Sequence, residues 1–366
     1  MNETKIAVNV ERMAGQFQQM VRIDSESGNE AAMMQYLLGA IREVGGEAEL
    51  DSYGNLIARF PSKGCQSAAP VLLSCHADTV KPGVGIEPVL EDGVIHSAGD
   101  TILGADDKAG IAEALEAMRI APVHPPVEFA VSRQEEVGLF GVKHLDFDKI
   151  SARRGFLLDN DSLETIVIGG PSYFAMDVEV TGKAAHAGME PEKGVNAIQA
   201  AARAIAALEL GRIDEQTTAN VGVITGGLIR NGVPDHVTFL AECRSADHDK
   251  GVALAKKMEQ IIKAEVEAAG ASVQIKIDNL CKAVRIPEDA WTVVTAQKAL
   301  STVGIRAKPI FITGFTDASI YNNHGIEMAV VGVGAQNEHS TDERVALADM
   351  EKAVVALVEM LRLSAV

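Results

Sequence analysis

The chain has 366 residues, of which 51 are acidic and 33 are Lys or Arg, so its formal net charge is −18. A surface this acidic should repel phosphate backbones and anionic lipid heads, and the longest basic runs are pairs such as Arg153-Arg154. We therefore expect no binding to nucleic acid and no association with a membrane. The length allows two domains, or one large one, to bury a core without disulfides.

Helical and strand patterns alternate along the first half of the chain. Apolar residues at three-to-four spacing predict helices, and short apolar runs predict buried strands. The expected helices cover residues 13–23, 30–44, 109–118 and 142–149, and the expected strands cover 55–60, 70–75, 127–132 and 155–159. This order predicts an α/β domain with a mostly parallel, helix-covered sheet. Ligands of such sheets bind beyond the carboxyl ends of the strands.

Near Pro171 the pattern changes to that of an α+β insert. Residues 174–180 (FAMDVEV) alternate apolar and polar side chains, as a sheet with one solvated face would. Helices are expected at 196–208 and 250–269, with strands at 220–225, 236–243 and 273–277. From Pro287 the first pattern returns, with strands at 308–312 and 328–334 and a helix at 317–323. We therefore predict a larger domain of residues 1–172 and 286–366, interrupted by a smaller domain of residues 173–285.

Acidic and imidazole side chains recur where the strands of the larger domain should end. These groups are His76-Ala77-Asp78, Asp106-Asp107, Glu135-Glu136, Asp159 and Glu338-His339. His76, Asp106 and Glu136 follow one another at intervals of 30 residues, about one strand-helix-strand unit. Successive strands should therefore bring these side chains to one rim of the sheet.

The rim would hold two imidazoles and at least three carboxylates, and the unpaired negative charge of those carboxylates would be strongly destabilising without a cation. Mixed His and carboxylate ligands suit zinc. A carboxylate that bridges two ions would make a two-metal site of the hydrolytic kind.

These motifs resemble those of the dinuclear zinc peptidases and amidohydrolases of family M20, which include peptidase T, carboxypeptidase G2, aminoacylase and succinyl-diaminopimelate desuccinylase. The resemblance extends over essentially the whole chain, and GADDKAGIAE with Asp at position 159 is most similar to the peptidase T branch. It implies two Zn²⁺ ions, for which Co²⁺ or Mn²⁺ could substitute. One ion would bind His76 and Asp159, the other Glu136 and His339, and Asp106 would bridge them.

The resemblance also implies catalytic roles for two carboxylates. Glu135 would act as the general base, and Asp78 would hydrogen-bond the ring of His76. The peptide bond between Asp106 and Asp107 would be cis. The smaller domain would be a lid and a surface for homodimerisation. In it, His186 would stabilise the oxyanion, from the same or the partner subunit, and Arg244 would bind a substrate carboxylate. Asn220, in the lid, and Gly314, in the larger domain, would contact polar groups of the substrate.

The favoured function is that of a metal-dependent exopeptidase acting on short peptides, specifically an aminotripeptidase. The alternatives are an amidohydrolase acting on N-acyl or N-carbamoyl amino acids, and a dipeptidase or carboxypeptidase of the same family. A non-catalytic binding protein on this scaffold would lack a metal ligand or the base. The five expected ligands and Glu135 are all present. The four cysteines form no CxxC pair, which favours reduced thiols in a cytoplasmic protein.

Overall fold

The computed structural model describes residues 7–65 and 68–366, whose contacts divide the chain into two compact units. Unit 1 comprises the described residues of Met1–Gly169 together with Arg285–Ile312 and Thr316–Val366. Unit 2 comprises Gly170–Val284 and Thr313–Phe315. The short segment Thr313–Phe315 therefore packs with unit 2, although the sequence division assigns residues 286–366 to the larger domain.

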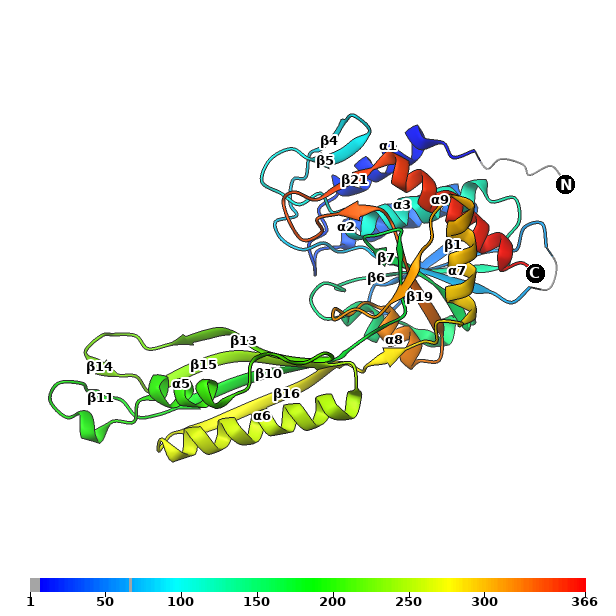
Figure 1. The fold of residues 1–366 in the computed structure, drawn as a ribbon. Helices are drawn as coiled ribbons and strands as arrows, with labels where there is room; N and C mark the ends of the chain where they lie inside the picture. Colours follow the sequence, from blue (N-terminus) through cyan, green and yellow to red (C-terminus); the bar gives the residue numbers. More distant parts are fainter. Residues whose placement is uncertain (1–6, 66–67) are drawn as a thin grey trace. The chain divides into compact units, whose positions relative to one another are not determined.

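Unit 1 is an α/β domain, and Figure 1 shows its large central sheet together with its helices. In the described residues the strand order is β1 (Glu47–Leu50), β2 (Leu56–Phe60), β6 (Val127–Ser132), β3 (Val71–His76), β7 (Arg154–Asn160), β19 (Glu327–Gly332), β8 (Thr165–Val167) and β18 (Lys308–Ile310). The central run β6-β3-β7-β19 is parallel, and so is the pair β8-β18. The pairs β1-β2, β2-β6 and β19-β8 are antiparallel. The predicted mostly parallel sheet is confirmed.

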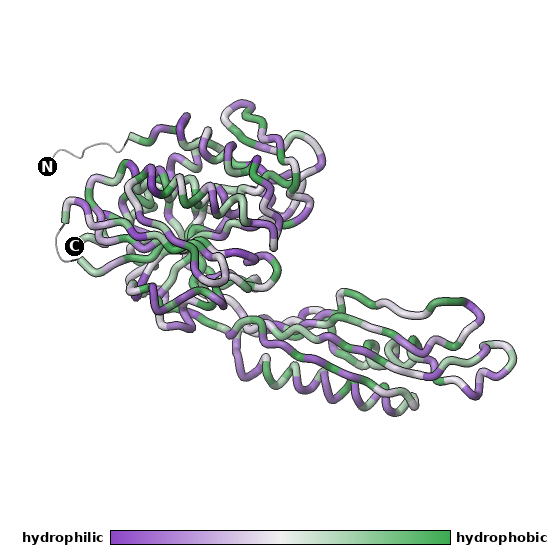
Figure 2. Tube along the Cα trace, turned by 180° about the vertical axis from the view of Figure 1, so that it is seen from behind, coloured by the Kyte–Doolittle hydropathy of each residue, from purple (hydrophilic) through white to green (hydrophobic). Residues whose placement is uncertain are grey.

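Helices cover both faces of this sheet. They are α1 (Val10–Val21), α2 (Ala31–Glu43), α3 (Ala105–Ile120), α4 (Phe140–Lys143), α7 (Trp291–Thr302), α8 (Ala318–Asn323) and α9 (Leu347–Leu363). Leu73 of β3 faces the core shared with α1, α2, α3, α7 and α9, while Leu72 is buried on the other side. Every residue of β3 is buried, which explains why the strand begins with the apolar run Val71–Leu73. In Figure 2 the strands at the centre of unit 1 are mostly green, the colour of apolar residues.

Local details of unit 1 differ from the sequence predictions. The helix expected at 142–149 is split into α4 and a 3₁₀ turn at Phe147–Lys149. Helix α3 begins at Ala105, four residues before the predicted start, and Asp106 and Asp107 in its first turn have non-helical backbone angles. A small sheet that the patterns do not indicate joins β20 (Ala335–Gln336), β21 (Arg344–Ala346), β5 (Val94–Ser97) and β4 (Pro88–Glu91).

Unit 2 is an antiparallel sheet covered by two helices. Its strand order is β12 (Gly211–Asp214), β13 (Thr217–Gly226), β15 (His236–Ser245), β10 (Ser172–Thr181) and β16 (Ser272–Cys281), and its helices are α5 (Ala197–Ala207) and α6 (His248–Ala268). Buried and accessible residues alternate along β10, as the FAMDVEV pattern predicts. The buried side chains form a core of their own with α5 and α6. Short pairs are formed by β11 (Ala185–His186) with β14 (Gly232–Val233) and by β9 (Gly169–Gly170) with β17 (Val284–Arg285).

Candidate metal centre

The carboxyl ends of the parallel strands supply most of the candidate ligands. His76 is the last residue of β3 and Asp159 is near the end of β7, and the two strands are neighbours in register. Glu135 and Glu136 follow the end of β6, which pairs with β3 so that Ser132 lies opposite His76. Asp106 comes from the start of α3, and His339 from the connection between β20 and β21.

Asp106 lies between two imidazole rings. Its Oδ1 is 3.0 Å from Nε2 of His76, and its Oδ2 is 3.1 Å from Nε2 of His339. A second carboxylate contacts each ring, because Asp159 Oδ1 is 3.4 Å from His76 Nε2 and Glu136 Oε1 is 3.0 Å from His339 Nε2. The five side chains thus form two mixed His and carboxylate groups that share Asp106.

Asp107, the neighbour of the shared carboxylate, also comes close to this group. Its side chain can share a site with His76 and Asp159, with ligand atoms within 4.8 Å of one another. However, Asp107 is fully buried, and its Oδ2 accepts a hydrogen bond from the backbone N–H of His76. We therefore regard Asp107 as a support for the His76 backbone. The peptide bond between Asp106 and Asp107 is cis, as the resemblance implies.

The electrostatics of the cluster are dominated by buried negative charge. Burial raises the pKa of Asp159 to about 7, and burial also raises the pKa of Glu136. Burial opposes ionisation of Asp106 too, but hydrogen bonds with His339 and His76 outweigh it and hold the pKa of Asp106 well below its usual range. Hydrogen bonds to Asp106 and Glu136 raise the pKa of His339 to about 11. The carboxylates therefore need a positive partner, which protonated imidazole or a divalent cation can provide. The donor set of imidazole nitrogens and carboxylate oxygens fits a zinc-type cation.

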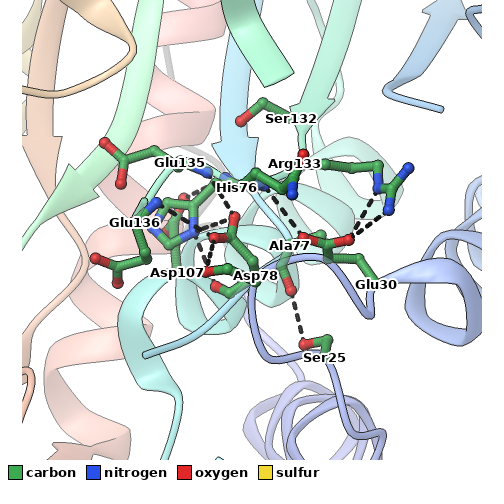
Figure 3. Close-up of polar contacts among 12 residues, drawn as sticks. Ser25, Glu30, His76, Ala77, Asp78, Asp107, Ser132, Arg133, Glu135 and Glu136 are labelled. Carbon is green, nitrogen blue, oxygen red and sulfur yellow. Dashed lines mark hydrogen bonds and ion pairs between the residues drawn. The ribbon is translucent and has the colours of Figure 1, made fainter. Parts of the chain in front are cut away.

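Glu135 and Glu136 occupy different surroundings although they are adjacent in the chain. Figure 3 shows their carboxyl groups on the same side of His76, away from the Glu30–Arg133 pair. Glu136 reaches His339, as described above. Glu135 is only 6 % exposed, and burial raises its pKa well above the usual value, with Asp159 adding to the effect. Glu135 is therefore a carboxylate whose surroundings favour taking up a proton.

Asp78 supports the segment that carries these two glutamates. Its Oδ1 accepts the N–H of Glu135 at 2.9 Å, and its Oδ2 accepts the N–H of Glu136 at 3.2 Å. The Ser27 hydroxyl also donates to Oδ2, at 2.6 Å. The ring Nδ1 of His76 lies 3.0 Å from the backbone carbonyl of Asp78 and 3.6 Å from its carboxylate. The hydrogen bond to the His76 ring thus falls to the backbone of Asp78, because the carboxylate is turned toward residues 135 and 136.

Sequence reasoning missed several buried groups around the cluster. Glu30 is fully buried and pairs with Arg133 at 2.7 Å (Figure 3). Glu30 also accepts the backbone N–H groups of Gly28 and Gln134, so it fixes the segment before Glu135. Asp317 accepts a hydrogen bond from Ser132 at the end of β6. Glu343 contacts the backbone of the Asp106 turn, as described below. For Glu343 the available signal was an acidic residue four positions after His339. Glu30 offered no such signal, because its partners Arg133 and Gln134 lie about 100 residues away in sequence.

The candidate substrate residues of the insert belong to unit 2. Arg244 uses Nε and Nη2 to bind both carboxylate oxygens of Glu242, at 3.2 and 3.0 Å, and its Nη1 donates to the carbonyl of Thr313 at 3.2 Å. Its guanidinium carbon lies 4.5 Å from the ring centre of Tyr173. Gly314, next to Thr313, is thereby brought to the same part of unit 2, and Asn220 lies opposite Glu242 on the neighbouring strand.

His186 stands apart from the Arg244 group. It is exposed on the short strand β11, and its Nδ1 accepts the N–H groups of Gly188 and Met189 at 3.2 and 3.1 Å. These bonds leave Nε2 as the ring atom available to donate a hydrogen bond.

Comparison with known proteins identifies the family. An aminopeptidase PepT from Bacillus cereus is 35% identical, with 98% of this chain and 100% of that chain covered and a TM-score of 0.89. A tripeptidase from Staphylococcus aureus is 32% identical, covering 98% of this chain and 99% of that chain, with a TM-score of 0.92. The chain belongs to the peptidase T branch of the M20 metallopeptidases.

Further similarities agree with this membership. Peptidase T from Listeria welshimeri is 24% identical over 96% of this chain and 98% of its own length. Residues 171–269 match the peptidase dimerisation domain, and residues 55–208 match peptidase family M28. The chain is thus a metal-dependent hydrolase of peptide bonds. No helix in the described part of the chain has the length and apolar character needed to span a membrane.

Proposed function

We propose that this protein is a dinuclear zinc aminopeptidase that acts on tripeptides, with its catalytic centre in unit 1 and a lid formed by unit 2. The main observation in support is that Asp106 lies between two His–carboxylate groups and contacts the imidazole of each. One ion would bind His76 and Asp159, the other Glu136 and His339, and Asp106 would bridge them. Zinc suits this donor set, and Co²⁺ or Mn²⁺ are possible substitutes. When bound, the metals supply Lewis-acid polarisation of the scissile carbonyl and acidify the attacking water.

Glu135 is proposed as the general base. Its carboxylate would take a proton from the attacking water and deliver it to the leaving amine, which is the usual division of labour in general acid–base catalysis. Burial raises the pKa of Glu135, and this supports the role. A carboxylate can both accept and release a proton most readily when its pKa lies close to the pH at which the enzyme works. Asp78 would hold the backbone of Glu135 and Glu136 in place through the hydrogen bonds described above.

Arg244 is proposed to bind the C-terminal carboxylate of the peptide, with Asn220 and Gly314 contacting other polar groups and His186 donating to the oxyanion. Glu242 and Thr313 hold the guanidinium along two of its edges, which supports a fixed orientation for a bidentate contact. The names of the Staphylococcus aureus and Bacillus cereus relatives favour an aminotripeptidase. A hydantoinase/carbamoylase family amidase shares the fold at 20% identity, so the fold is also compatible with the amidohydrolase alternative.

A homodimer formed through unit 2 is proposed as the working assembly. The match to a peptidase dimerisation domain supports it. Within the described residues, β12 pairs only with the first part of β13, up to Ala219, so the edge of β13 beyond that point has no neighbouring strand. Val223, Ile224 and Leu228 on and after this edge are 50%, 52% and 98% exposed. Such an edge favours pairing with a second copy. The four cysteines, all within the described residues, form no disulfide with one another, which supports a reducing, cytoplasmic location.

Metal removal and a substrate panel test this function together. Prolonged dialysis against a chelator should abolish hydrolysis of a tripeptide, and two equivalents of Zn²⁺ or Co²⁺ should restore it. The metal-loaded protein should hydrolyse free tripeptides faster than dipeptides, N-acyl amino acids or N-carbamoyl amino acids. Full activity of the demetallated protein would contradict the metal site, and a preference for an acylated amino acid would favour the amidohydrolase alternative.

A further inference from the structure

Glu343 is a buried carboxylate that no ligand or catalytic role accounts for. It precedes β21 and is only 1 % exposed. Its Oε2 accepts the backbone N–H groups of Leu103 and Gly104 at 2.8 and 2.7 Å, and its Oε1 accepts the N–H of Asp106 at 3.0 Å. One side chain therefore binds three backbone donors in the turn that presents Asp106.

The same side chain belongs to the loop that presents His339. Asn337 and His339 both have left-handed backbone angles, with φ of 58° and 59°, a conformation that costs non-glycine residues free energy. Hydrogen bonds within the loop join Ser340 Oγ to the Asn337 carbonyl at 2.7 Å and the Glu343 N–H to the Ser340 carbonyl at 3.2 Å. The loop thus has a fixed internal shape, and the Glu343 carboxylate ties that shape to the Asp106 turn about 240 residues earlier.

We propose that Glu343 is a positioning residue for the metal ion shared by Asp106 and His339. The proposal rests on the two-metal site of the proposed function. Asp106 and His339 come from separate loops, and a metal site tolerates little error in the placement of its ligands. The Glu343 carboxylate fixes the distance between the two loops through three hydrogen bonds to backbone. Loss of these bonds should weaken the ion held by Glu136, His339 and Asp106 more than the ion held by His76, Asp159 and Asp106, because only the first takes a ligand from the His339 loop.

Capping of α3 is the simpler role that the experiment must separate from positioning. The N–H groups of Leu103, Gly104 and Asp106 lie at or just before the start of α3, so a carboxylate there also satisfies donors that the helix leaves free. A cap contributes to the stability of the fold in the absence of metal. Loss of a cap alone would not lower the affinity for one metal ion more than the affinity for the other.

Glu128 offers a matched control. It is 6 % exposed and likewise accepts backbone hydrogen bonds, from the N–H groups of Ser151 and Ala152 at 2.9 and 3.0 Å. It lies near the amino end of β6, at the opposite end of the strand from the Glu135 segment. Glu128→Gln should therefore reproduce the loss of a buried carboxylate without touching the ligand loops.

The test compares zinc binding to full-length wild type, Glu343→Gln and Glu128→Gln by equilibrium dialysis in zinc buffers, with the Tm of each apoprotein measured in parallel. We expect Glu343→Gln to bind one equivalent as wild type does and the second about 10- to 100-fold more weakly, the range typical for lost supports of metal ligands. Glu128→Gln should lower the Tm of the apoprotein and bind both equivalents with wild-type affinity. Unchanged affinity for both ions in Glu343→Gln, or an equal loss of both, would overturn the proposal.

A second variant covers the case in which Glu343→Gln does not fold. Glu343→Asp keeps the charge but is shorter by one methylene, so it should reach fewer of the three donors and again weaken one ion selectively. Wild-type affinity for both ions in this variant would also overturn the proposal. Binding of a single ion by the wild type would instead contradict the two-metal function, and the comparison with Glu128→Gln would still decide whether Glu343 affects that ion.

Discussion

The neighbouring glutamates 135 and 136 are proposed to act as a base and as a metal ligand, and their different positions, rather than their residue type, support this division. Glu136 Oε1 lies 3.0 Å from His339, so its negative charge is already engaged. The charged carboxylates that act on Glu135, among them Asp159 and Asp317, raise its pKa further beyond the effect of burial. A group that is not tied to a counter-charge remains available for proton transfer.

Replacement of Glu135 by Gln should therefore remove catalysis while leaving the site assembled. The amide is nearly isosteric but cannot accept the proton, so kcat should fall by about 10² to 10⁴, the usual contribution of general acid–base catalysis. KM should change little, because the lost step belongs to the transition state. Steady-state kinetics with a tripeptide and metal analysis of the same sample would check both points.

The contrasting variant is Glu136→Gln, which weakens a proposed ligand. It should lower the metal content of the purified protein, and added zinc should partly restore its activity. If Glu135→Gln lost metal in the same way, or kept wild-type turnover, the assignment of base and ligand would be reversed or wrong.

Arg244 is held in one orientation by its contacts with Glu242, Thr313 and the ring of Tyr173. Lysine in its place would keep the charge but lose the planar fork. We expect Arg244→Lys to raise KM about tenfold for tripeptides with a free carboxylate, since a charged hydrogen bond contributes about 1.5–3 kcal/mol. C-terminally amidated peptides, assayed with the same enzyme, should show a much smaller change. Equal effects on the two substrates would mean that Arg244 does not bind the carboxylate.

At the scale of elements, the close approach of α3 to β7 sets the position of two candidate ligands, Asp106 and Asp159. Gly110 is the point of contact, because a Cβ built there would lie 2.4 Å from the Leu158 carbonyl oxygen and 2.4 Å from Asp107 Oδ1. Neither atom can move freely, since one belongs to a strand backbone and the other to a buried side chain. Glycine at this position allows the helix to lie against the strand beside Asp159.

Gly110→Ala should consequently destabilise the protein by about 1–3 kcal/mol, the usual range for overpacking a core. Urea unfolding, monitored by circular dichroism, would measure the change. The control is Gly39→Ala in α2, where the added Cβ would meet nothing within 4 Å. There the better helix propensity of alanine should stabilise the protein by about 0.5–1 kcal/mol. A neutral Gly110→Ala would show that α3 can shift without cost.

The elements also show what sequence patterns could and could not predict. Strand β3 was recognisable because it is buried on both faces, and its last residue, His76, followed from the strand boundary. The start of α3 was placed too late, because Asp106 and Asp107 depart from helical geometry and carry no apolar periodicity. Glu30 binds Arg133 and Gln134 about 100 residues away, and Glu343 binds N–H groups about 240 residues away, so local patterns did not indicate these partners. The candidate ligands were chosen from strand ends and family motifs, and the structure brings these five side chains together around Asp106.

For the molecule as a whole, the two units differ in how they are assembled from the chain. Unit 2 is almost continuous, from Gly170 to Val284, and its sheet and helices enclose a core of their own. Unit 1 needs both ends of the chain, since β18, β19 and helices α7–α9 come from residues after 285. Its core joins residues such as Phe17 of α1 and Leu357 of α9.

Fragments should reflect this difference. Residues 170–284, expressed alone, should fold and unfold cooperatively on heating, because every element of the unit 2 sheet and its helices is included. Residues 1–169 should not give a cooperative transition, because β19 and α9 are missing. Circular dichroism melts of the two fragments would test this, and a sharp transition for residues 1–169 would contradict it.

The place of β19 in the sheet has a consequence for synthesis on the ribosome. β19 lies between β7 and β8, both of which are translated more than 150 residues earlier. Until residues 327–332 emerge, the nascent chain carries a gap at the middle of its sheet, with the edge of β7 unpaired next to Asp159. Such an edge is a site for wrong pairing. Chaperones that bind exposed apolar strands should therefore be needed most in the interval between completion of unit 2 and release of the chain.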